Sequence, residues 1–356
     1  MPRTLTHALH AGASPQQLYH KLVDEGWPPE IALATLQHAL QSLPGRVVLR
    51  ATGLVKRFGP RTVLNDISFD IQAGQVLGII GPSGVGKTTL LTLLAGWQAP
   101  DRGTVEFFAD KSVHVHEQPL FVRRLFGFAA QRPSLYPKLT ALENILHFAA
   151  LHGVLPDEQH SRAQRLLDLI GLREQANMFA EQLSGGQQKR LDIACALVHQ
   201  PQVLFLDEPV ADLDPDSRER VWSLMRALAQ QGVAVVLATH FLSELEKTCD
   251  EVIALQHSRI VAQGTPEEIV RQHHLSSLVV IRTAKAEYPQ LLRMLKGVTL
   301  VHSTESTLLL RSSAPHELAA QLPVALSKIN DRLVELQIQP PGLNEVFAHL
   351  SRAHRG

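Results

Sequence analysis

Apolar and polar residues follow two alternating patterns over residues 46–270 of the chain. Short continuous apolar runs predict buried strands, and the longer segments between them, with an apolar residue every three or four positions, predict helices. The runs that predict strands are VVLRAT, QVLGIIG, GTVEFF, LFGFAA, QVLFLD, VAVVLAT and EVIALQ. Strands that alternate with helices usually form a largely parallel sheet covered by helices. The pattern therefore predicts an α/β fold for this part of the chain.

Three other segments depart from the alternation. Residues 139–200 show helical periodicity without strands and predict a helical insert, and residues 15–42 predict two short helices joined at Gly-Trp-Pro. After residue 266 the pattern follows a β-α-β-β-α-β order, typical of a small split-βαβ domain, and ends in the helix NEVFAHL. We therefore expect an N-terminal helical extension, a central α/β domain with a helical subdomain, and a C-terminal α+β domain, over residues 1–45, 46–272 (subdomain about 132–182) and 273–356.

The composition indicates the cellular compartment of the chain but says little about any reaction that it catalyses. The 356 residues are 45% apolar and 19% charged, which is ordinary for a globular protein, and 34 basic residues balance 34 acidic ones. A balanced charge gives no overall attraction to nucleic acid or anionic lipid. The two cysteines lack metal-ligand spacing, the N-terminus lacks the apolar core of a signal peptide, and no apolar run is long enough to span a membrane. We expect a cytoplasmic chain that reaches a membrane only through a partner.

A glycine-rich loop supplies the first chemical signal. The apolar run LGII leads directly into GPSGVGKTT and then into the helical run LLTLLAG, which is the strand–loop–helix context of a phosphate-binding loop. Backbone N–H groups of such a loop surround an anion, Lys87 reaches the β- and γ-phosphates, and Thr88 binds Mg²⁺. The motif alone does not separate an ATPase from a kinase or a GTPase. The candidate nucleotide-binding residues are Gly81, Pro82, Ser83, Gly84, Val85, Gly86, Lys87, Thr88 and Thr89.

Two carboxylates follow a second apolar run, VLFLDEP. Adjacent residues of a strand face opposite sides, but at the end of a strand both can turn toward a nucleotide. Asp207 suits the outer shell of Mg²⁺, and Glu208 suits the polarisation of an attacking water, which contributes roughly 10²–10⁴ in rate. Chemistry alone leaves the reverse assignment open. Without the upstream phosphate loop, both residues would be read as an exposed turn.

The segment LSGGQ, residues 183–187, predicts a second anion site. Ser184 is a good N-cap, and the glycines after it leave several N–H donors unpaired at the positive end of a helix. If the helical insert carries this segment away from the sheet, one chain cannot grip one γ-phosphate from both sides. Two copies arranged head to tail solve the geometry, because each LSGGQ then covers the nucleotide of the other copy. A plain helix start is the alternative on local grounds.

Taken together, residues 46–270 resemble the nucleotide-binding domain of an ATP-binding cassette (ABC) protein. GPSGVGKTT resembles the Walker A loop, VLFLDE the Walker B strand and LSGGQ the family signature. The resemblance implies a P-loop NTPase core with a RecA-like parallel sheet, an antiparallel β part and a helical insert. It also implies ATP and Mg²⁺ as cofactors, a homodimer, and nucleotide contacts from Ser184, Gly185, Gly186 and Gln187.

The same resemblance assigns residues that would carry no signal alone. Gln131 corresponds to the Q-loop sensor of Mg²⁺ and water, and His240 corresponds to the switch histidine that contacts the γ-phosphate. Phe58 stands at the position that stacks on adenine, where the family usually has tyrosine. Asp214 ends the D-loop, which crosses to the opposite subunit. Asp212 departs from the family, which more often has a small residue there, and the N-terminal helical pair is absent from the core family.

Three roles are open to an ABC ATPase: the energising subunit of a membrane transporter, a soluble ATPase of repair, translation or assembly, and a binding module without turnover. The complete catalytic set argues against the binding module. The chain has one cassette, and no zinc-ligand cysteines or long coiled-coil arms separate the phosphate loop from LSGGQ. These features and the balanced charge argue against a nucleic-acid partner. The sequence favours the transporter subunit, with a soluble ABC ATPase as the alternative.

The C-terminal pattern narrows the type of transporter. The β-α-β-β-α-β order followed by PPGLNEVFAHL resembles the tail of ATPases that pair with ABC-2-type exporter permeases. This resemblance implies export through an integral-membrane permease in a separate chain, with the ATPase peripheral on the inner face of the cell membrane. We expect the segment after Gln131 to form the groove for a permease helix, although part of it could be core of the insert. The candidate lining residues are Leu135, Tyr136, Leu139 and Leu142.

Overall fold

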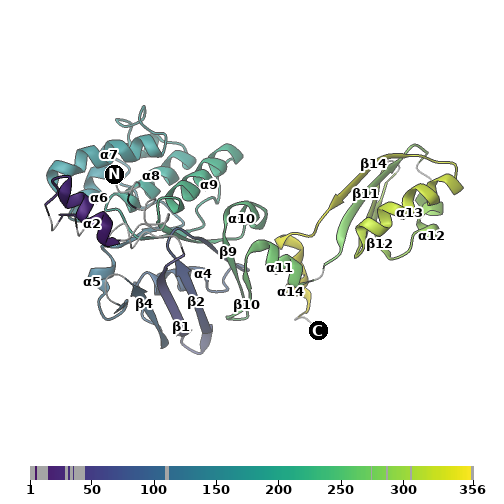
Figure 1. The fold of residues 1–356 in the computed structure, drawn as a ribbon, viewed down its shortest axis with the longest axis horizontal. Helices are drawn as coiled ribbons and strands as arrows, with labels where there is room; N and C mark the ends of the chain where they lie inside the picture. Colours follow the sequence, from purple (N-terminus) through teal and green to yellow (C-terminus); the bar gives the residue numbers. More distant parts are fainter. Residues whose placement is uncertain are drawn as a thin grey trace. The chain divides into compact units, whose positions relative to one another are not determined.

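The chain divides into two compact units. The first runs through Phe241 and also contains Thr248–Gln263, and the second contains Leu242–Lys247 and Gly264–Gly356. Figure 1 shows the ribbon of both units. The computed structural model describes residues 5, 15–28, 31–32, 35, 45–108, 112–273, 275–285, 288–304 and 307–353.

A short helix, α2 (Pro15–Asp24), is the first of the two predicted N-terminal helices. Leu18 and Leu22 on one face of α2 are buried together with Leu5 and Ala32. The second predicted helix lies largely outside the described residues.

A six-stranded sheet forms the centre of the first unit. Its strand order is β10-β9-β3-β8-β7-β6, and the pairs β3–β8, β3–β9, β7–β8 and β6–β7 are parallel. Every residue of β3, β7 and β8 is buried, as expected for strands that have helices on both faces. The strands span Phe126–Ala129 (β6), Val76–Ile80 (β3), Val203–Asp207 (β7), Ala234–Thr239 (β8), Glu251–Gln256 (β9) and Arg259–Gly264 (β10).

A separate antiparallel sheet has the order β2-β1-β4-β5. The predicted strands VVLRAT and GTVEFF belong to this sheet, not to the parallel one. Its longest hairpin, β1 with β2, includes a strand that the apolar runs did not indicate, because β2 alternates buried and exposed positions and so lacks a continuous run. The strands span Val47–Phe58 (β1), Arg61–Gln72 (β2), Arg102–Phe108 (β4) and Ser112–His114 (β5).

Phenylalanine rings join the two sheets. Phe107 of β4 meets Phe126 of β6 edge to face at 5.0 Å between ring centroids, and Phe126 meets Phe205 of β7 at 5.5 Å. Such pairs contribute about 0.5–1.5 kcal/mol each beyond the area that they bury. The first helix after β3, α4 (Lys87–Leu94), contributes four leucines to the same core.

The helical subdomain contains α6 (Ala141–Leu151), α7 (Pro156–Leu169), a 3₁₀ turn (Ala180–Gln182) and the start of α8 (Gly185–Leu197). Thr140 and Glu143 cap α6 reciprocally. The fully buried Asn144 accepts a hydrogen bond from the N–H of Tyr136 and donates to its carbonyl, which fixes the segment before α6. Figure 1 shows α6, α7, α8 and α9 (Pro215–Ala229) gathered on one side of this unit, with β1, β2 and β4 on the other.

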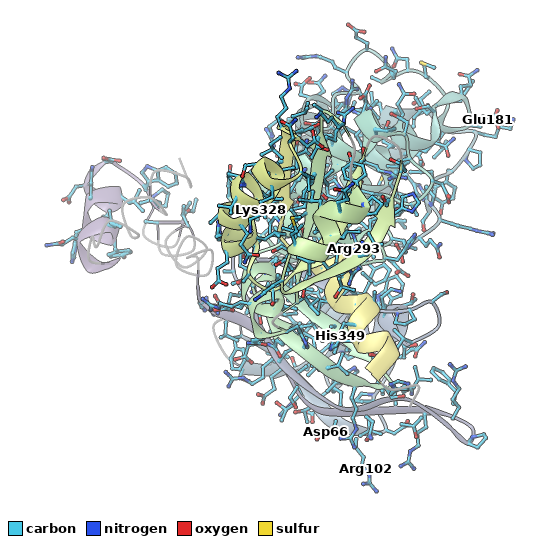
Figure 2. The ribbon with its side chains drawn as sticks, turned by 90° about the vertical axis from the view of Figure 1, so that its right-hand side faces the viewer. Asp66, Arg102, Glu181, Arg293, Lys328 and His349 are labelled. Carbon is cyan, nitrogen blue, oxygen red and sulfur yellow. The ribbon has the colours of Figure 1, made fainter. Side chains whose placement is uncertain are left out.

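The second unit has the predicted β-α-β-β-α-β order. Its sheet has the order β12-β13-β11-β14 with all neighbours antiparallel. Leucines of α13 pack with buried residues of β11 and β13, and Figure 2 shows the exposed side chains of Arg293 and Lys328. The elements are β11 (Ser277–Thr283), α12 (Tyr288–Met294), β12 (Val298–Ser303), β13 (Leu308–Ser312), α13 (Pro315–Lys328) and β14 (Leu333–Gln339).

The described residues of the second unit also form α11 (Pro266–Gln272), α14 (Leu343–Ala353) and most of α10 (Leu242–Thr248), whose last residue belongs to the first unit. The N–H of Leu343, at the start of α14, donates to the carboxylate of Glu246 on α10. A negative charge at this end of a helix compensates the helix dipole. The predicted terminal helix NEVFAHL is α14.

Replacement of Phe205 by alanine tests the packing between the sheets. Phe205 is fully buried, so its loss should lower the free energy of unfolding of the first unit by about 3–5 kcal/mol. Phe121 lies in α5 (Pro119–Val122) and is 45% exposed, so Phe121→Ala is the matched control and should cost under about 1 kcal/mol. Tryptophan fluorescence in urea reports this unit selectively, because it holds all three tryptophans. Equal losses for the two variants would contradict the assigned core.

Candidate functional site

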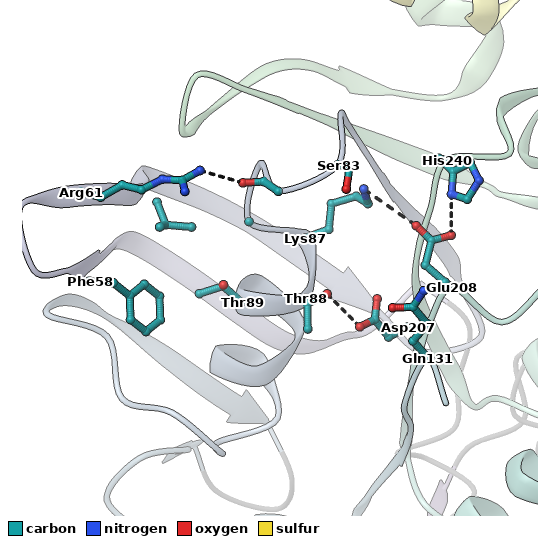
Figure 3. Close-up of a pocket in the computed structure, with 13 residues that line it drawn as sticks. Phe58, Arg61, Ser83, Lys87, Thr88, Thr89, Gln131, Asp207, Glu208 and His240 are labelled. Atoms are coloured by element: carbon teal, nitrogen blue, oxygen red, sulfur yellow. Dashed lines mark hydrogen bonds and ion pairs between the residues drawn. The ribbon is translucent and has the colours of Figure 1, made fainter. Parts of the chain in front are cut away.

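One cavity of about 630 Å³ opens where strands of the parallel sheet end (Figure 3). Ligands of open α/β sheets bind in this position, outside the carboxyl ends of the strands. The loops after β3, β6, β7 and β8 all contribute to it, as does the β1–β2 hairpin. The sequence-predicted residues that line the cavity are Phe58, Ser83, Gly84, Gly86, Lys87, Thr88, Thr89, Gln131, Asp207, Glu208 and His240.

The loop between β3 and α4 requires glycine at two points. Gly86 is the N-cap of α4 and has φ of 114°, a backbone conformation that residues with a side chain rarely adopt. In addition, a Cβ at this position would lie 2.8 Å from Val63 Cγ1. A Cβ on Gly81 would lie 2.5 Å from the carbonyl oxygen of Leu255. The loop therefore keeps its backbone close to its neighbours, with the start of α4 facing the cavity. Gly81, Pro82 and Val85 belong to this loop without lining the cavity.

Lys87 is the buried cation of the site. Its Nζ donates to the carbonyl oxygens of Gly81 at 2.9 Å and Pro82 at 3.4 Å, and lies 3.9 Å from Glu208 Oε1. Burial lowers the pKa of Lys87, and the carboxylates of Glu208 and Asp207 oppose that change. The side chain is 9% exposed. An ammonium group in this position attracts an anionic ligand strongly, because little water screens it.

Asp207 and Thr88 form a compact group of oxygen atoms. The Thr88 hydroxyl donates to Asp207 Oδ2 at 2.8 Å. Burial raises the pKa of Asp207, and the hydrogen bond from Thr88 lowers it in part. With the amide of Gln131 at the same cavity, the group offers a hydroxyl, a carboxylate and an amide oxygen. Hard divalent cations prefer oxygen ligands of these kinds, so the residues fit Mg²⁺.

Glu208 turns its carboxylate into the cavity through an unusual backbone conformation. Its φ is +45°, and its N–H donates to the carbonyl of Ala238 on β8 at 2.8 Å. This turn at the end of β7 brings two consecutive acidic residues to one cavity, as the sequence predicted. Backbone conformations of this kind cost about 1–3 kcal/mol and occur mainly at functional sites.

The Glu208 carboxylate is held from two sides (Figure 3). One oxygen faces Lys87, and the other lies 3.0 Å from Nδ1 of His240, which follows β8. The Glu208 side chain is 11% exposed and the His240 side chain 59% exposed. A carboxylate fixed beside a cation and an imidazole, and open to a cavity, is suited to accept a proton from water.

The β1–β2 hairpin adds an aromatic wall. Phe58 at the end of β1 is 48% exposed, so one face of its ring is open to a flat ligand such as a nucleobase. Its cross-strand partner Arg61 donates to the carbonyl of Gly84 at 3.1 Å. Arg61 and Val63 line the cavity but were not predicted. Their position depends on the hairpin register, and the sequence would have indicated it only if β2 had been recognised.

The LSGGQ segment starts α8 but does not line the cavity. Ser184 caps the helix by accepting from the N–H of Gln187, whose side chain accepts from the N–H of Ser184. Gly186 packs so closely on α9 that a Cβ would lie 2.4 Å from Ser217 Oγ. Asp214 caps α9 in turn and also lies outside the cavity. The structure therefore separates Ser184, Gly185, Gly186, Gln187 and Asp214 from the other predicted site residues.

Residues 64–211 match the ABC transporter family. The chain is 32% identical over 307 residues to "Nod factor export ATP-binding protein I" of Sinorhizobium fredii, an alignment that covers 86% of each chain. The chain belongs to the ABC transporter family. It is an ATP-binding subunit of that family, binds nucleotide, and is an ATPase coupled to transport, as the sequence predicted.

Other members of the family support the assignment. "Daunorubicin/doxorubicin resistance ATP-binding protein DrrA" of Streptomyces peucetius is 32% identical over 316 residues, which cover 88% of this chain and 94% of that protein. Among solved structures, cbiO1 from Clostridium perfringens, part of the ABC transporter complex cbiONQ, has a TM-score of 0.59 and 29% identity over 64% of this chain and 92% of its own. The present chain therefore has the fold of ABC ATPases. No helix in the described ranges could cross a membrane.

Replacement of Lys87 by alanine should weaken ATP binding by about tenfold or more, because it removes the buried cation of the predicted phosphate-binding loop. Lys138→Ala is the matched control: the Lys138 side chain is 82% exposed, and ATP affinity should not change. Isothermal titration with ATP measures both. Unaltered affinity in Lys87→Ala would contradict the assigned phosphate loop.

Proposed function

We propose that two copies of this subunit associate head to tail around two ATP molecules with Mg²⁺ and drive export through a separate membrane permease. The proposal rests above all on one observation. The cavity collects the Walker A, Walker B, Q-loop and switch residues, whereas none of residues 184–187 lines it.

The start of α8 supports a second contact with ATP. Ser184 and Gly185 are exposed, and the first N–H groups of a helix carry a positive partial charge that favours a phosphate. The cavity of one copy would contact a nucleotide from the sheet side only. A second copy turned by a twofold axis would place its Ser184 over the γ-phosphate and receive the same contact in return. Asp214 and its loop would lie at this seam.

The lining residues define the chemistry. Thr88, Asp207 and Gln131 would hold Mg²⁺, which neutralises charge on the β- and γ-phosphates when bound. Glu208 would accept a proton from the attacking water. His240 would keep Glu208 oriented through the hydrogen bond at Nδ1 and leave its other ring nitrogen for the γ-phosphate.

An exposed apolar surface beside the Q-loop supports contact with a permease. Tyr136 is 46% exposed and rests its ring against His147 of α6 at 4.5 Å, and Leu135, Leu139 and Leu142 are half-buried near it. An exposed apolar surface of this kind can accept an amphipathic helix from a partner. We place the subunit at the inner face of the cell membrane for this reason.

The names of the relatives support export. The two proteins described above act in Nod factor export and in daunorubicin and doxorubicin resistance, and "Linearmycin resistance ATP-binding protein LnrL" of Bacillus subtilis is 28% identical over 85% of this chain. These alignments extend well beyond the nucleotide-binding domain, so they include part of the C-terminal unit. We therefore propose export as the direction of transport.

Glu208→Gln tests the proposed dimer. The amide keeps the side-chain shape but cannot accept the proton from water, so ATP should stay bound and the closed dimer should accumulate. Size-exclusion chromatography with light scattering should show a dimer with ATP and Mg²⁺ and a monomer without them. Lys87→Ala/Glu208→Gln is the matched control and should stay monomeric. A Glu208→Gln protein that binds ATP to saturation and remains monomeric would contradict the proposal.

A further inference from the structure

Two buried charges on α8, Lys189 and Asp192, do not belong to the cavity. Each residue is 4% exposed, and they lie three positions apart, on one face of the helix that begins with the signature. Their closest approach, Lys189 Nζ to Asp192 Oδ2, is 3.9 Å. Two buried charges oppose folding unless hydrogen bonds compensate them. Both find these hydrogen bonds in the same loop.

The loop that they contact carries Gln131. Lys189 Nζ donates to the carbonyl of Ala130 at 2.5 Å, directly before Gln131, and Asp192 Oδ1 accepts from the N–H of Ser134 at 2.9 Å, three residues after it. The two side chains therefore hold both ends of the short segment 130–134. Gln131 itself is exposed and lines the cavity.

Two further observations join α8 to the site. Gly127 of β6, the strand that leads into this loop, approaches α8 so closely that a Cβ would lie 2.4 Å from the carbonyl of Ala196. Lys189 is also near enough to Asp207 for each charge to stabilise the other. The signature helix thus contacts the strand before Gln131 and both ends of the loop that carries Gln131. Through Lys189 it also interacts electrostatically with the Walker B carboxylate, Asp207.

We propose that Lys189 and Asp192 are positioning residues that fix the Gln131 loop to the signature helix, so that Gln131 stays aligned with the Mg²⁺ site. This inference rests on the proposed role of Gln131. It adds a physical link between the signature and the Q-loop. If α8 shifts when Ser184 binds a phosphate, both ends of the loop that carries Gln131 shift with it. An apolar pair could fill the space but could not hold a carbonyl and an N–H.

Burial shifts the pKa values of both members of the pair. Burial raises the pKa of Asp192 to about 6, opposed by the hydrogen bond from Ser134 and the charge of Lys189. Burial lowers the pKa of Lys189. Asp192 Oδ2 has no hydrogen-bond partner within the described residues, so only one oxygen of the carboxylate is used for the loop.

Lys189→Met and Asp192→Ala in the full chain test the link. Hydrogen exchange of the peptide around Ser134 should become about tenfold faster, because the loop loses one of its attachments. The Mg²⁺ concentration for half-maximal ATPase activity should rise about tenfold, since loss of a group that orients a metal ligand typically costs 10–100-fold in metal affinity. ATP affinity in EDTA should stay within about twofold, because the phosphate loop is untouched.

Controls separate positioning from simple stability. Asp192→Asn keeps an oxygen for the Ser134 N–H and should restore most of the Mg²⁺ dependence. The exposed pair Lys138–Glu181 in the same unit provides matched variants, Lys138→Met and Glu181→Ala, which should leave both measurements unchanged. Exchange or Mg²⁺ half-saturation as in the wild type for Lys189→Met and Asp192→Ala would overturn the inference.

Gln131→Ala, measured in parallel, distinguishes the two levels of the proposal. If Gln131→Ala leaves Mg²⁺ half-saturation unchanged, the proposed role of Gln131 is wrong, and the inference falls with it. If Gln131→Ala raises half-saturation while the two α8 variants do not, the proposed site stands and only the link is wrong.

Discussion

The site depends on the burial of one cation. Lys87 is held by two carbonyl oxygens and forms a long ion pair with Glu208, whose Oε1 lies 3.9 Å from its Nζ. A desolvated ammonium in this state gains most from a polyanion that replaces the lost water. The close approaches at Gly81 and Gly86 keep the loop around it, and the phenylalanine contacts between the sheets keep the loop near the hairpin that carries Phe58. Nucleotide binding follows from this arrangement.

Catalysis requires that protein groups be fixed around the bound phosphates from more than one direction. Glu208 reaches the cavity through a left-handed turn and is held by His240, and Thr88 holds Asp207. These contacts within the protein organise the sheet side of the pocket, which lowers the cost of ordering it in the reaction. In the proposed function, the exposed start of α8 is the complementary half of the site, and Lys189 and Asp192 connect that helix to the Gln131 loop. The proposed dimer brings the two halves together.

Local motifs were predictable, and positions that depend on tertiary register were not. The phosphate loop and the Asp207–Glu208 end of β7 were found because strand, loop and helix follow each other in sequence. The β-α-β-β-α-β order of the second unit was found from its periodicity. Arg61 was missed because β2 alternates buried and exposed positions and gave no apolar run. Lys189 and Asp192 were missed because charged residues early in a helix usually face water, and only the packing of α8 on β6 shows that they are buried.

The most direct test of the central claim is a cryo-electron-microscopy structure of the hydrolysis-blocked protein with ATP and Mg²⁺. The account predicts two copies related by a twofold axis, with the γ-phosphate bound by Lys87 of one copy and lying within hydrogen-bond distance of Ser184 and the first N–H groups of α8 of the other. A nucleotide bound at Lys87 with its γ-phosphate open to solvent, or covered by Ser184 of the same copy, would contradict it.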